Sequence, residues 1–356
     1  GTVDATPLFI YLAGRYYRRT GDLEFIRSLW GNIEAALAWC DRHGDRDGDG
    51  FVEYGTKAIG GLSQQGWKDS EDSVFHADGT LAKGPIALCE VQAYVHAAKL
   101  AAADLADALG RAAAGARLRG EAADLKERFL RAFWLNDIGA YALALDGAKR
   151  PCRVRSSNAG QCLFTGIADP SHASRIADLM VSESMFTGFG VRTIAEGEAR
   201  YNPMSYHNGS VWPHDNALIA LGLSRMGHCA EACRILEGQF AAALFMDQHR
   251  LPELFCGFIR RPGEGPTHYP VACLPQAWAA GSVYMLLEAV LGITVDALAR
   301  RVVFNAPMLP AFLGELRIEG LKVGAASVDL VLRRHTEDVT IEIARRSGKV
   351  EILETK

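Results

Sequence analysis

The feature that most constrains the fold is a change in hydrophobic period near residue 295. Before it, apolar residues recur at helical spacing, as in Phe25, Leu29, Ile33 and Leu37. After it, apolar and polar residues alternate in the manner of strands, as in the segment 326–332. We therefore expect a helical domain over residues 1–295, followed by a small β-strand region over residues 296–356.

The helical region predicts an all-α architecture built from paired helices. Helices are expected at 7–19, 22–43, 84–109, 111–134, 157–166, 170–182, 209–227, 229–245 and 271–292, with a short extended piece at 141–145. Alternating short and long connections are typical of antiparallel hairpins stacked around an axis. No strict repeat of roughly 34 or 40 residues is present, which disfavours a solenoid. A closed toroid of hairpins fits better, because its long loops can gather at one end.

Composition excludes several classes of function. The net charge of -4 and the absence of a dense Lys/Arg cluster argue against nucleic-acid binding. The sequence contains no run of roughly 18 apolar residues, so it predicts no membrane span. The 8 cysteines include no C-x2-C pair, so we expect no zinc site or other metal, no cofactor, and reduced thiols in a cytoplasmic protein.

The first polar loop begins with Asp45, Asp47 and Asp49 in the spacing of a calcium loop. An EF-hand also requires a following helix, which the sequence does not predict here. A tight turn held by the Asp side chains is the simpler interpretation. Such a turn would deliver Glu53 and Tyr54 to the end of the loop.

The second polar loop, residues 64–73, places three carboxylates within four residues of one another. Composition alone is equally compatible with a solvated acidic loop. Trp67 favours a sugar site, because an indole offers an apolar face to a pyranose ring, and Gln65 and Lys68 can bind hydroxyls. A carboxyl group in a partly apolar, like-charged setting can keep its proton near neutral pH. The carboxylates are Asp69, Glu71 and Asp72.

Two later segments also concentrate polar and aromatic groups. Residues 206–216 precede a strong helix, so helix capping and aromatic packing explain part of their composition. Glu253 lies among Leu, Pro and Phe, where an unpaired carboxylate is costly to bury. A structural ion pair with Arg260 or Arg261 is the alternative to a catalytic role. Two carboxyl groups in one pocket suggest glycoside hydrolysis, in which one protonates the leaving oxygen and the other activates water.

At these segments the chain resembles the helical-barrel glycoside hydrolases of the glycogen-debranching, amylo-alpha-1,6-glucosidase-like group. It is also similar to mannosylglycerate and glucosylglycerate hydrolases and, more distantly, to trehalases and processing α-glucosidases. The matching stretches are GTVDATPLFI, DRDGDGFVEY, QGWKDSEDSVFHADG, GPIALCEVQAYVHAA, YHNGSVWPHDNALIA and LPELFCG. Together they cover residues 1 to about 293.

The resemblance implies an (α/α)6 barrel and an inverting hydrolase of α-glucosidic bonds. It places the general acid at Asp72, with Asp69 as the rival, and the general base at Glu253. The residues it implies for the sugar subsite are Glu53, Tyr54, Gln65, Trp67, Lys68, Asp69, His207, Asn208 and Trp212. Asp4 and Thr6 are weaker candidates for the same rim.

Relatives carry a β-rich domain and further barrel helices before the segment that opens this chain. We therefore expect a barrel that is incomplete at its N-terminal side, with a missing domain or a second copy covering the opening. Three alternatives remain open. They are a truncated carbohydrate-binding remnant without catalysis, a hydrolase of mannosylglycerate or glucosylglycerate, and a helical scaffold for protein partners.

Overall fold

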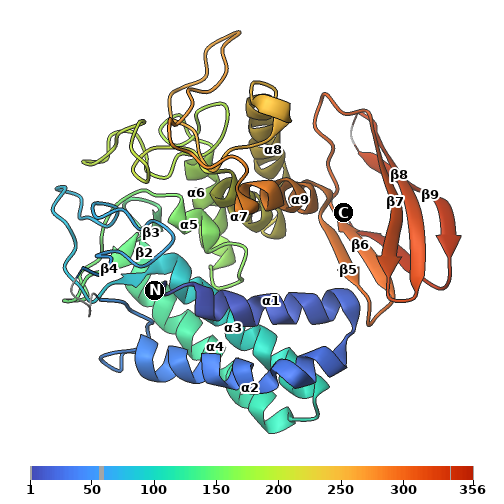
Figure 1. Ribbon diagram of the computed structural model, residues 1–356, viewed down its shortest axis with the longest axis horizontal. Helices are drawn as coiled ribbons and strands as arrows, with labels where there is room; N and C mark the ends of the chain where they lie inside the picture. The colour runs from blue at the N-terminus through green and yellow to red at the C-terminus, as the bar shows by residue number, and fades with distance from the viewer. Residues whose placement is uncertain (1, 56–59, 337, 356) are drawn as a thin grey trace.

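The computed structural model describes residues 2–55, 60–336 and 338–355, and shows a helical part followed by a β-rich part (Figure 1). The helices are α1 (Ala5–Thr20), α2 (Leu23–Trp39), α3 (Cys89–Ala108), α4 (Ala112–Phe133), α5 (Asn158–Gln161), α6 (Pro170–Met180), α7 (Pro213–Arg225), α8 (Cys229–Ala243) and α9 (Ala277–Leu291). A π-helical turn at Cys40–Gly44 extends α2, and a 3-10 turn at Asp247–His249 follows α8.

The helices pack as hairpins around a curved inner row. The odd-numbered helices contact one another in succession from α1 to α9, while α2, α4 and α8 each pair with the inner helix before them. The two ends of the row are joined by an ion pair between Arg15 of α1 and Glu288 of α9, with 2.6 Å between the charged atoms. Beside it, α1, α9, β5 (Ile293–Asp296) and β7 (Glu315–Val323) line a hollow of about 620 Å³.

Local signals placed most helix boundaries correctly. The Asp22 carboxylate accepts a hydrogen bond from the Phe25 amide at 3.0 Å, which confirms the predicted N-cap of α2. Three predicted helices begin too early, and the one expected from residue 209 starts only at Pro213 of α7. Residues 84–88 form a turn and the strand β1 (Ala87–Leu88), and residues 271–276 are a loop that precedes α9. In both segments a proline, Pro85 or Pro275, precedes the true start and opposes helix propagation.

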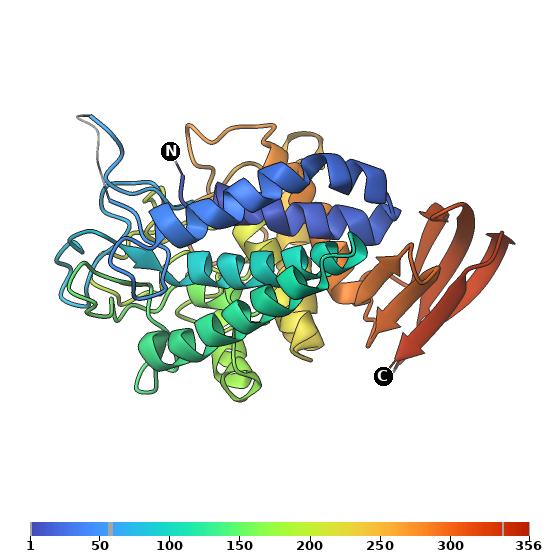
Figure 2. The same cartoon turned by 90° about the horizontal axis from the view of Figure 1, so that it is seen from below.

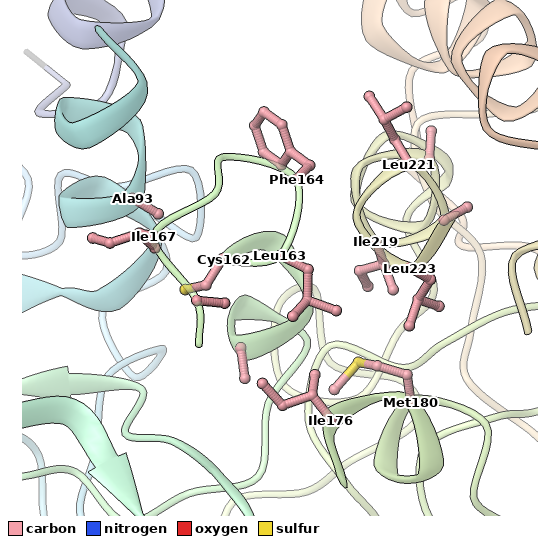
Figure 3. Packing of buried hydrophobic residues seen from close by; sticks show 14 of the residues in the cluster. Ala93, Cys162, Leu163, Phe164, Ile167, Ile176, Met180, Ile219, Leu221 and Leu223 are labelled. Carbon is pink, nitrogen blue, oxygen red and sulfur yellow. The ribbon is translucent and has the colours of Figure 1, made fainter. Parts of the chain in front are cut away.

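The helix predicted over residues 157–166 is reduced to the single turn α5. Figure 3 shows this turn wedged between α3, α6 and α7, with Leu163 facing Ile219 and Leu223. A Cβ atom on Gly160 would lie 2.9 Å from the Ile219 side chain, so glycine permits this close approach. The chain then turns away at Gly166, whose φ of +82° favours glycine. Periodicity does not reveal this interruption, because the residues after α5 are also apolar.

The β-rich part consists of two three-stranded sheets, with the strand orders β10-β6-β5 and β7-β8-β9. Its remaining strands are β6 (Arg301–Asn305), β8 (Ala326–Arg334), β9 (Val339–Ser347) and β10 (Glu351–Thr355). Buried side chains of both sheets, such as Phe304 and Leu332, belong to the main hydrophobic core. Short strands also occur between helices: β2 (Trp134–Leu135), β3 (Ala140–Tyr141) and β4 (Ala144–Leu145). The fold is therefore mixed rather than all-α, with the nine helices before residue 292 and the two three-stranded sheets after it in the described chain.

The first residues of the inner helices and the long loops meet at one end of the helical row. The Val3 amide beside α1 donates to the Gln65 carbonyl at 2.8 Å, and the Ser157 amide beside α5 donates to the Thr193 carbonyl at 3.1 Å. His214 in the first turn of α7 contacts Trp67, with 4.8 Å between ring centroids. Figure 2 shows the loops of residues 45–55 and 60–86 at the end of the molecule away from the β sheets. This end holds all four segments that the sequence singled out.

Within the described residues, no helix combines the length and the hydropathy needed to cross a lipid bilayer.

Candidate active site

A cluster of seven aromatic rings marks the place where the loops meet the inner helices. Trp212 lies at its centre, with ring centroids 5.6 Å from Trp67, 4.9 Å from Tyr206 and 5.0 Å from His207. The other members are His214, Trp278 and Tyr269, which contact Trp212 or Tyr206. The loop of residues 64–73, the segment 206–214 and the start of α9 therefore meet in a single ring cluster, hereafter the aromatic cluster.

Glu253 lies against this cluster with both carboxylate oxygens hydrogen-bonded. Oε1 accepts from the Tyr206 hydroxyl at 2.8 Å, and Oε2 accepts from the Cys273 amide at 3.0 Å. The Glu253 amide in turn donates to the Cys273 carbonyl at 3.0 Å. The side chain is buried, with 6% of the residue exposed. A buried carboxylate held by neutral donors, with no compensating cation among the described residues, is costly unless it has a chemical task.

The alternative explanation for Glu253, an ion pair with Arg260 or Arg261, does not match the structure. The Arg260 guanidinium lies 5.1 Å from the centre of the Phe189 ring. Arg261 pairs with Glu264, with 3.8 Å between the charged atoms. Both arginines are therefore engaged elsewhere.

The two candidate acids, Asp69 and Asp72, lie at the rim of the site with about half of each side chain exposed. The Asp69 carboxylate is 4.0 Å from His207 Nδ1, an atom that is also 2.7 Å from the Ser70 hydroxyl. The Asp72 carboxylate is 4.0 Å from an Arg200 nitrogen, and its main-chain carbonyl accepts from the Asn208 amide group at 3.1 Å. The segment around residue 207 thus fixes the loop that carries both acids.

Tyr206 connects this loop with Glu253. Burial raises the pKa of its hydroxyl most strongly, and the negative charges of Glu253 and then Asp69 raise the pKa further. The hydroxyl therefore lies within the field of both carboxylates. The structure thus brings the second and fourth polar segments of the sequence to one place.

Lys68 belongs to the loop of residues 64–73, and only 4% of the residue is exposed. Its ammonium group donates to Asn158 Oδ1 at 2.6 Å, to the Thr193 carbonyl at 2.9 Å and to the Ser157 hydroxyl at 3.3 Å. An ammonium group has three hydrogens, so these contacts use its full donor capacity. Burial lowers its pKa to about 8. Lys68 therefore anchors the loop to α5 and has no hydrogen left for a sugar hydroxyl.

The remaining candidates from the first two loops make their polar contacts away from the aromatic cluster. Glu53 is buried and pairs with Lys149. The Tyr54 hydroxyl donates to Gln64, and the Gln65 side-chain amide donates to the Leu62 carbonyl at 3.3 Å. These contacts hold the two loops in their conformations.

The Asp-rich loop is the predicted tight turn. Asp45 accepts from the amides of Gly48 at 2.8 Å and Gly50 at 2.9 Å. The carboxylates of Asp45, Asp47 and Asp49 can bring an oxygen each within 4.8 Å of one another. The Lys149 ammonium group lies 2.9 Å from Asp47 and 2.6 Å from Asp49, so the protein supplies a positive charge there itself.

Sequence reasoning missed a set of buried polar residues in the first turns of the inner helices. Burial raises the pKa of Glu90 in α3 to about 7 and also raises that of Asp215 in α7. Asp215 accepts from Gln161, which also accepts from Tyr94. A charged residue in the first turn of an apolar helix, as in CEVQ and PHDN, is the signal that was available for them.

The aromatic cluster also holds polar atoms that lack a partner. Trp67 Nε1, His207 Nε2 and His214 Nδ1 are buried and have no hydrogen-bond partner among the described residues. Burial, followed by the charge of Lys68, lowers the pKa of both histidines to about 3, so they are neutral near pH 7. Neutral imidazole and indole nitrogens can hydrogen-bond sugar hydroxyls, but in this structure all three atoms are buried.

The neutral state of His207 predicts how stability depends on pH. Its pKa is about 3 in the folded chain, against about 6.5 when unfolded, so between these values the unfolded state binds more protons and stability falls as pH falls. Lowering the pH from 7 to 5 is expected to cost about 2 kcal/mol through this residue. Urea unfolding of wild type and His207→Asn at both pH values measures this contribution as a difference in slope, with exposed His43→Asn as control. Equal slopes for wild type and His207→Asn would contradict the prediction.

Comparison with known proteins identifies the family of the chain. The family model of the mannosylglycerate hydrolase MGH1-like glycoside hydrolase domain matches residues 3–255. The chain belongs to this family. The match to this glycoside hydrolase domain thus runs from the start of the helical part up to the loop that carries Glu253. No curated protein sequence matches it.

Solved structures show where the fold recurs. A sialidase superposes with a TM-score of 0.72 at 11% identity, covering 94% of this chain and 31% of the sialidase. The GH78 family rhamnosidase of Bacillus sp. GL1 gives 0.70 at 16% identity, covering 99% of this chain and 33% of the rhamnosidase. The chain therefore spans about a third of the length of these proteins. The GH63 mannosylglycerate hydrolase from Thermus thermophilus in complex with glucose gives 0.44 at 19% identity, covering 56% of this chain and 47% of that one.

The first two likenesses concern the fold alone. They include the β-rich part as well as the helical part, since each covers nearly the whole MGH1-like chain. The combination of a hairpin row with a β-rich tail is therefore a recurring architecture. The chemistry of the site depends on the residues that this chain places there.

Proposed function

We propose that the chain hydrolyses α-glucosidic bonds with inversion, in oligosaccharides, glycogen-like glucans or small glucosides. Asp72 is the general acid that protonates the departing glycosidic oxygen. Glu253 is the general base that takes a proton from water attacking the opposite face of the sugar. The observation that carries the proposal is the buried Glu253 carboxylate at the edge of the aromatic cluster, together with a nearby loop that bears the half-exposed carboxyl groups of Asp69 and Asp72.

The two candidate carboxyl groups differ in burial and in their contacts. Glu253 accepts hydrogen bonds on both oxygens, which stabilise its ionised form, as a base needs. The carboxyl groups of Asp69 and Asp72 are about half exposed, each with one basic side chain at 4.0 Å, so both remain accessible to a substrate. An inverting pair is expected to be roughly 6.5–9.5 Å apart, which leaves room for the water.

Asp69 and Asp72 are assigned different tasks. Asp72 is the acid, because its position fits the pattern of related enzymes and because Asn208 fixes its main chain. Asp69, beside His207 and within the field that acts on Tyr206, is assigned to a sugar hydroxyl. Trp67 and His207 are assigned to the same subsite, and the buried Trp212 packs against both of their rings.

A second candidate is hydrolysis of mannosylglycerate or glucosylglycerate. The observation that favours it is the family itself, which is named for a mannosylglycerate hydrolase. The chemistry of the two carboxyl groups would be the same, and only the leaving group and the sugar would differ.

The test is a hydrolysis assay of the whole chain on maltose, isomaltose, small aryl α-glucosides, glucosylglycerate and mannosylglycerate. The proposal predicts release of glucose from at least one of the first three compounds. Release from the two glycerate compounds alone would favour the second candidate. Binding of these sugars without release from any of them would contradict hydrolysis and favour a binding remnant.

A further inference from the structure

Besides the Cys273 thiol, which also hydrogen-bonds to Glu253, the Tyr206 hydroxyl is a side-chain donor to this carboxylate. Its oxygen lies 2.8 Å from Glu253 Oε1, while the main-chain amide of Cys273 holds Oε2 at 3.0 Å. A carboxylate has about four lone-pair positions, so these bonds leave capacity for a water molecule. Because the Tyr206 hydroxyl and the Cys273 amide hold different oxygens, rotation of the carboxylate about its last side-chain bond breaks at least one hydrogen bond.

Tyr206 is itself held from several sides. Its ring contacts His207 at 4.6 Å, Trp212 at 4.9 Å and Tyr269 at 5.4 Å between centroids. Its main-chain carbonyl accepts from Trp212 Nε1 at 2.9 Å and from the Ser210 hydroxyl at 2.6 Å. Both the backbone and the ring plane are thereby fixed, so the hydroxyl is a pre-positioned donor.

The direction of the hydrogen bond follows from the surroundings of the hydroxyl. Burial and the adjacent Glu253 charge raise the pKa of Tyr206 well above its usual value. The phenol therefore keeps its proton at neutral pH and donates it to the carboxylate. Such a charge-assisted bond is stronger than one between neutral groups.

We propose that Tyr206 is a positioning residue for the reaction, whose hydroxyl orients the Glu253 carboxylate toward the attacking water and stabilises its ionised form. The inference rests on the proposed role of Glu253 as general base. It adds the claim that the aromatic cluster has a second task besides contact with sugar, which is to hold the residue that aims the base.

The test compares Tyr206→Phe with Tyr201→Phe, using the α-glucoside that the wild-type chain hydrolyses fastest. Tyr201 is a partly buried tyrosine on the same segment, and its ring lies against the Arg192 guanidinium rather than in the aromatic cluster. Tyr206→Phe is expected to lower kcat about 10- to 100-fold with less than about threefold change in KM. Tyr201→Phe is expected to leave both parameters near wild type.

The pH profile separates positioning from a structural or substrate-binding role. Removing a donor from a carboxylate disfavours its charged form. The acidic limb of kcat against pH is therefore expected to move upward by about one pH unit in Tyr206→Phe. Unchanged kcat, or a loss confined to KM with no movement of the limb, would overturn the inference.

A parallel Glu253→Gln variant distinguishes failure of the inference from failure of the proposed function. If Glu253→Gln is inactive while Tyr206→Phe behaves as wild type, only the positioning role is wrong. If Glu253→Gln keeps wild-type turnover, the proposed base is wrong and the Tyr206 inference falls with it. Thermal unfolding of each variant confirms that a loss of kcat is measured on folded protein.

Discussion

Replacing Glu253 by Gln is expected to lower kcat by about 10³-fold, within the range typical of a lost general base or acid. The amide has nearly the same shape and can still accept from the Cys273 amide, so folding is expected to be preserved. What disappears is the ability to take a proton from water. Steady-state kinetics on the best substrate, with thermal unfolding alongside, measures the effect.

The matched control for this variant is Glu264→Gln, in the same long loop. Glu264 is exposed and its contact is a 3.8 Å pair with Arg261, which is worth little at a surface. Its replacement is expected to leave kcat unchanged. Wild-type turnover in Glu253→Gln would contradict the assignment of the base.

Replacing Asp72 by Asn is expected to lower kcat by about 10³-fold on substrates with a poor leaving group, such as maltose. The loss is expected to shrink to less than about tenfold on α-glucosyl fluoride, because fluoride leaves without help from a general acid. Asp69→Asn is expected to weaken hydrolysis of both substrates, since contact with a sugar hydroxyl matters whatever the leaving group.

Glu71→Gln is the control for both of these variants, because it lies between them on the loop with an exposed side chain. It is expected to retain full activity. If Asp69→Asn, rather than Asp72→Asn, recovers activity on the fluoride, the two roles are reversed. If neither variant loses activity on maltose, this loop does not supply the acid.

Much of the fold was predictable because its signals are local. The Asp22 cap and the apolar stripe of α2 lie within a few turns of each other, and the alternation of β8 is visible in seven consecutive residues, 326–332. The shortness of α5 was not predictable, because it depends on the approach of Gly160 to Ile219, nearly sixty residues further along. The strands between the helices were not predictable either, because each is only two residues long and leaves no periodic pattern.

In the candidate site, too, local features were predictable and tertiary contacts were not. Trp67, His207 and Trp212 could be singled out from their segments, and the structure places them together. The burial of Lys68 could not be predicted from the sequence, because its hydrogen-bond acceptors belong to Ser157, Asn158 and Thr193, about 90 or more residues further along the chain. Nor could the sequence show that Tyr206 and Cys273 hold Glu253, since these contacts join residues that are distant in the chain. Residue types indicated the chemistry, and tertiary contacts decide which side chains remain free to perform it.

The central claim is that Glu253 activates water on the face of the sugar opposite the departing oxygen. Proton NMR of the first sugar released from an α-glucoside, recorded before mutarotation, tests it most directly. Inversion predicts that β-glucose appears first and that the α anomer accumulates later by mutarotation. Initial release of α-glucose would indicate retention of configuration and would contradict the role of Glu253 as the general base of an inverting reaction.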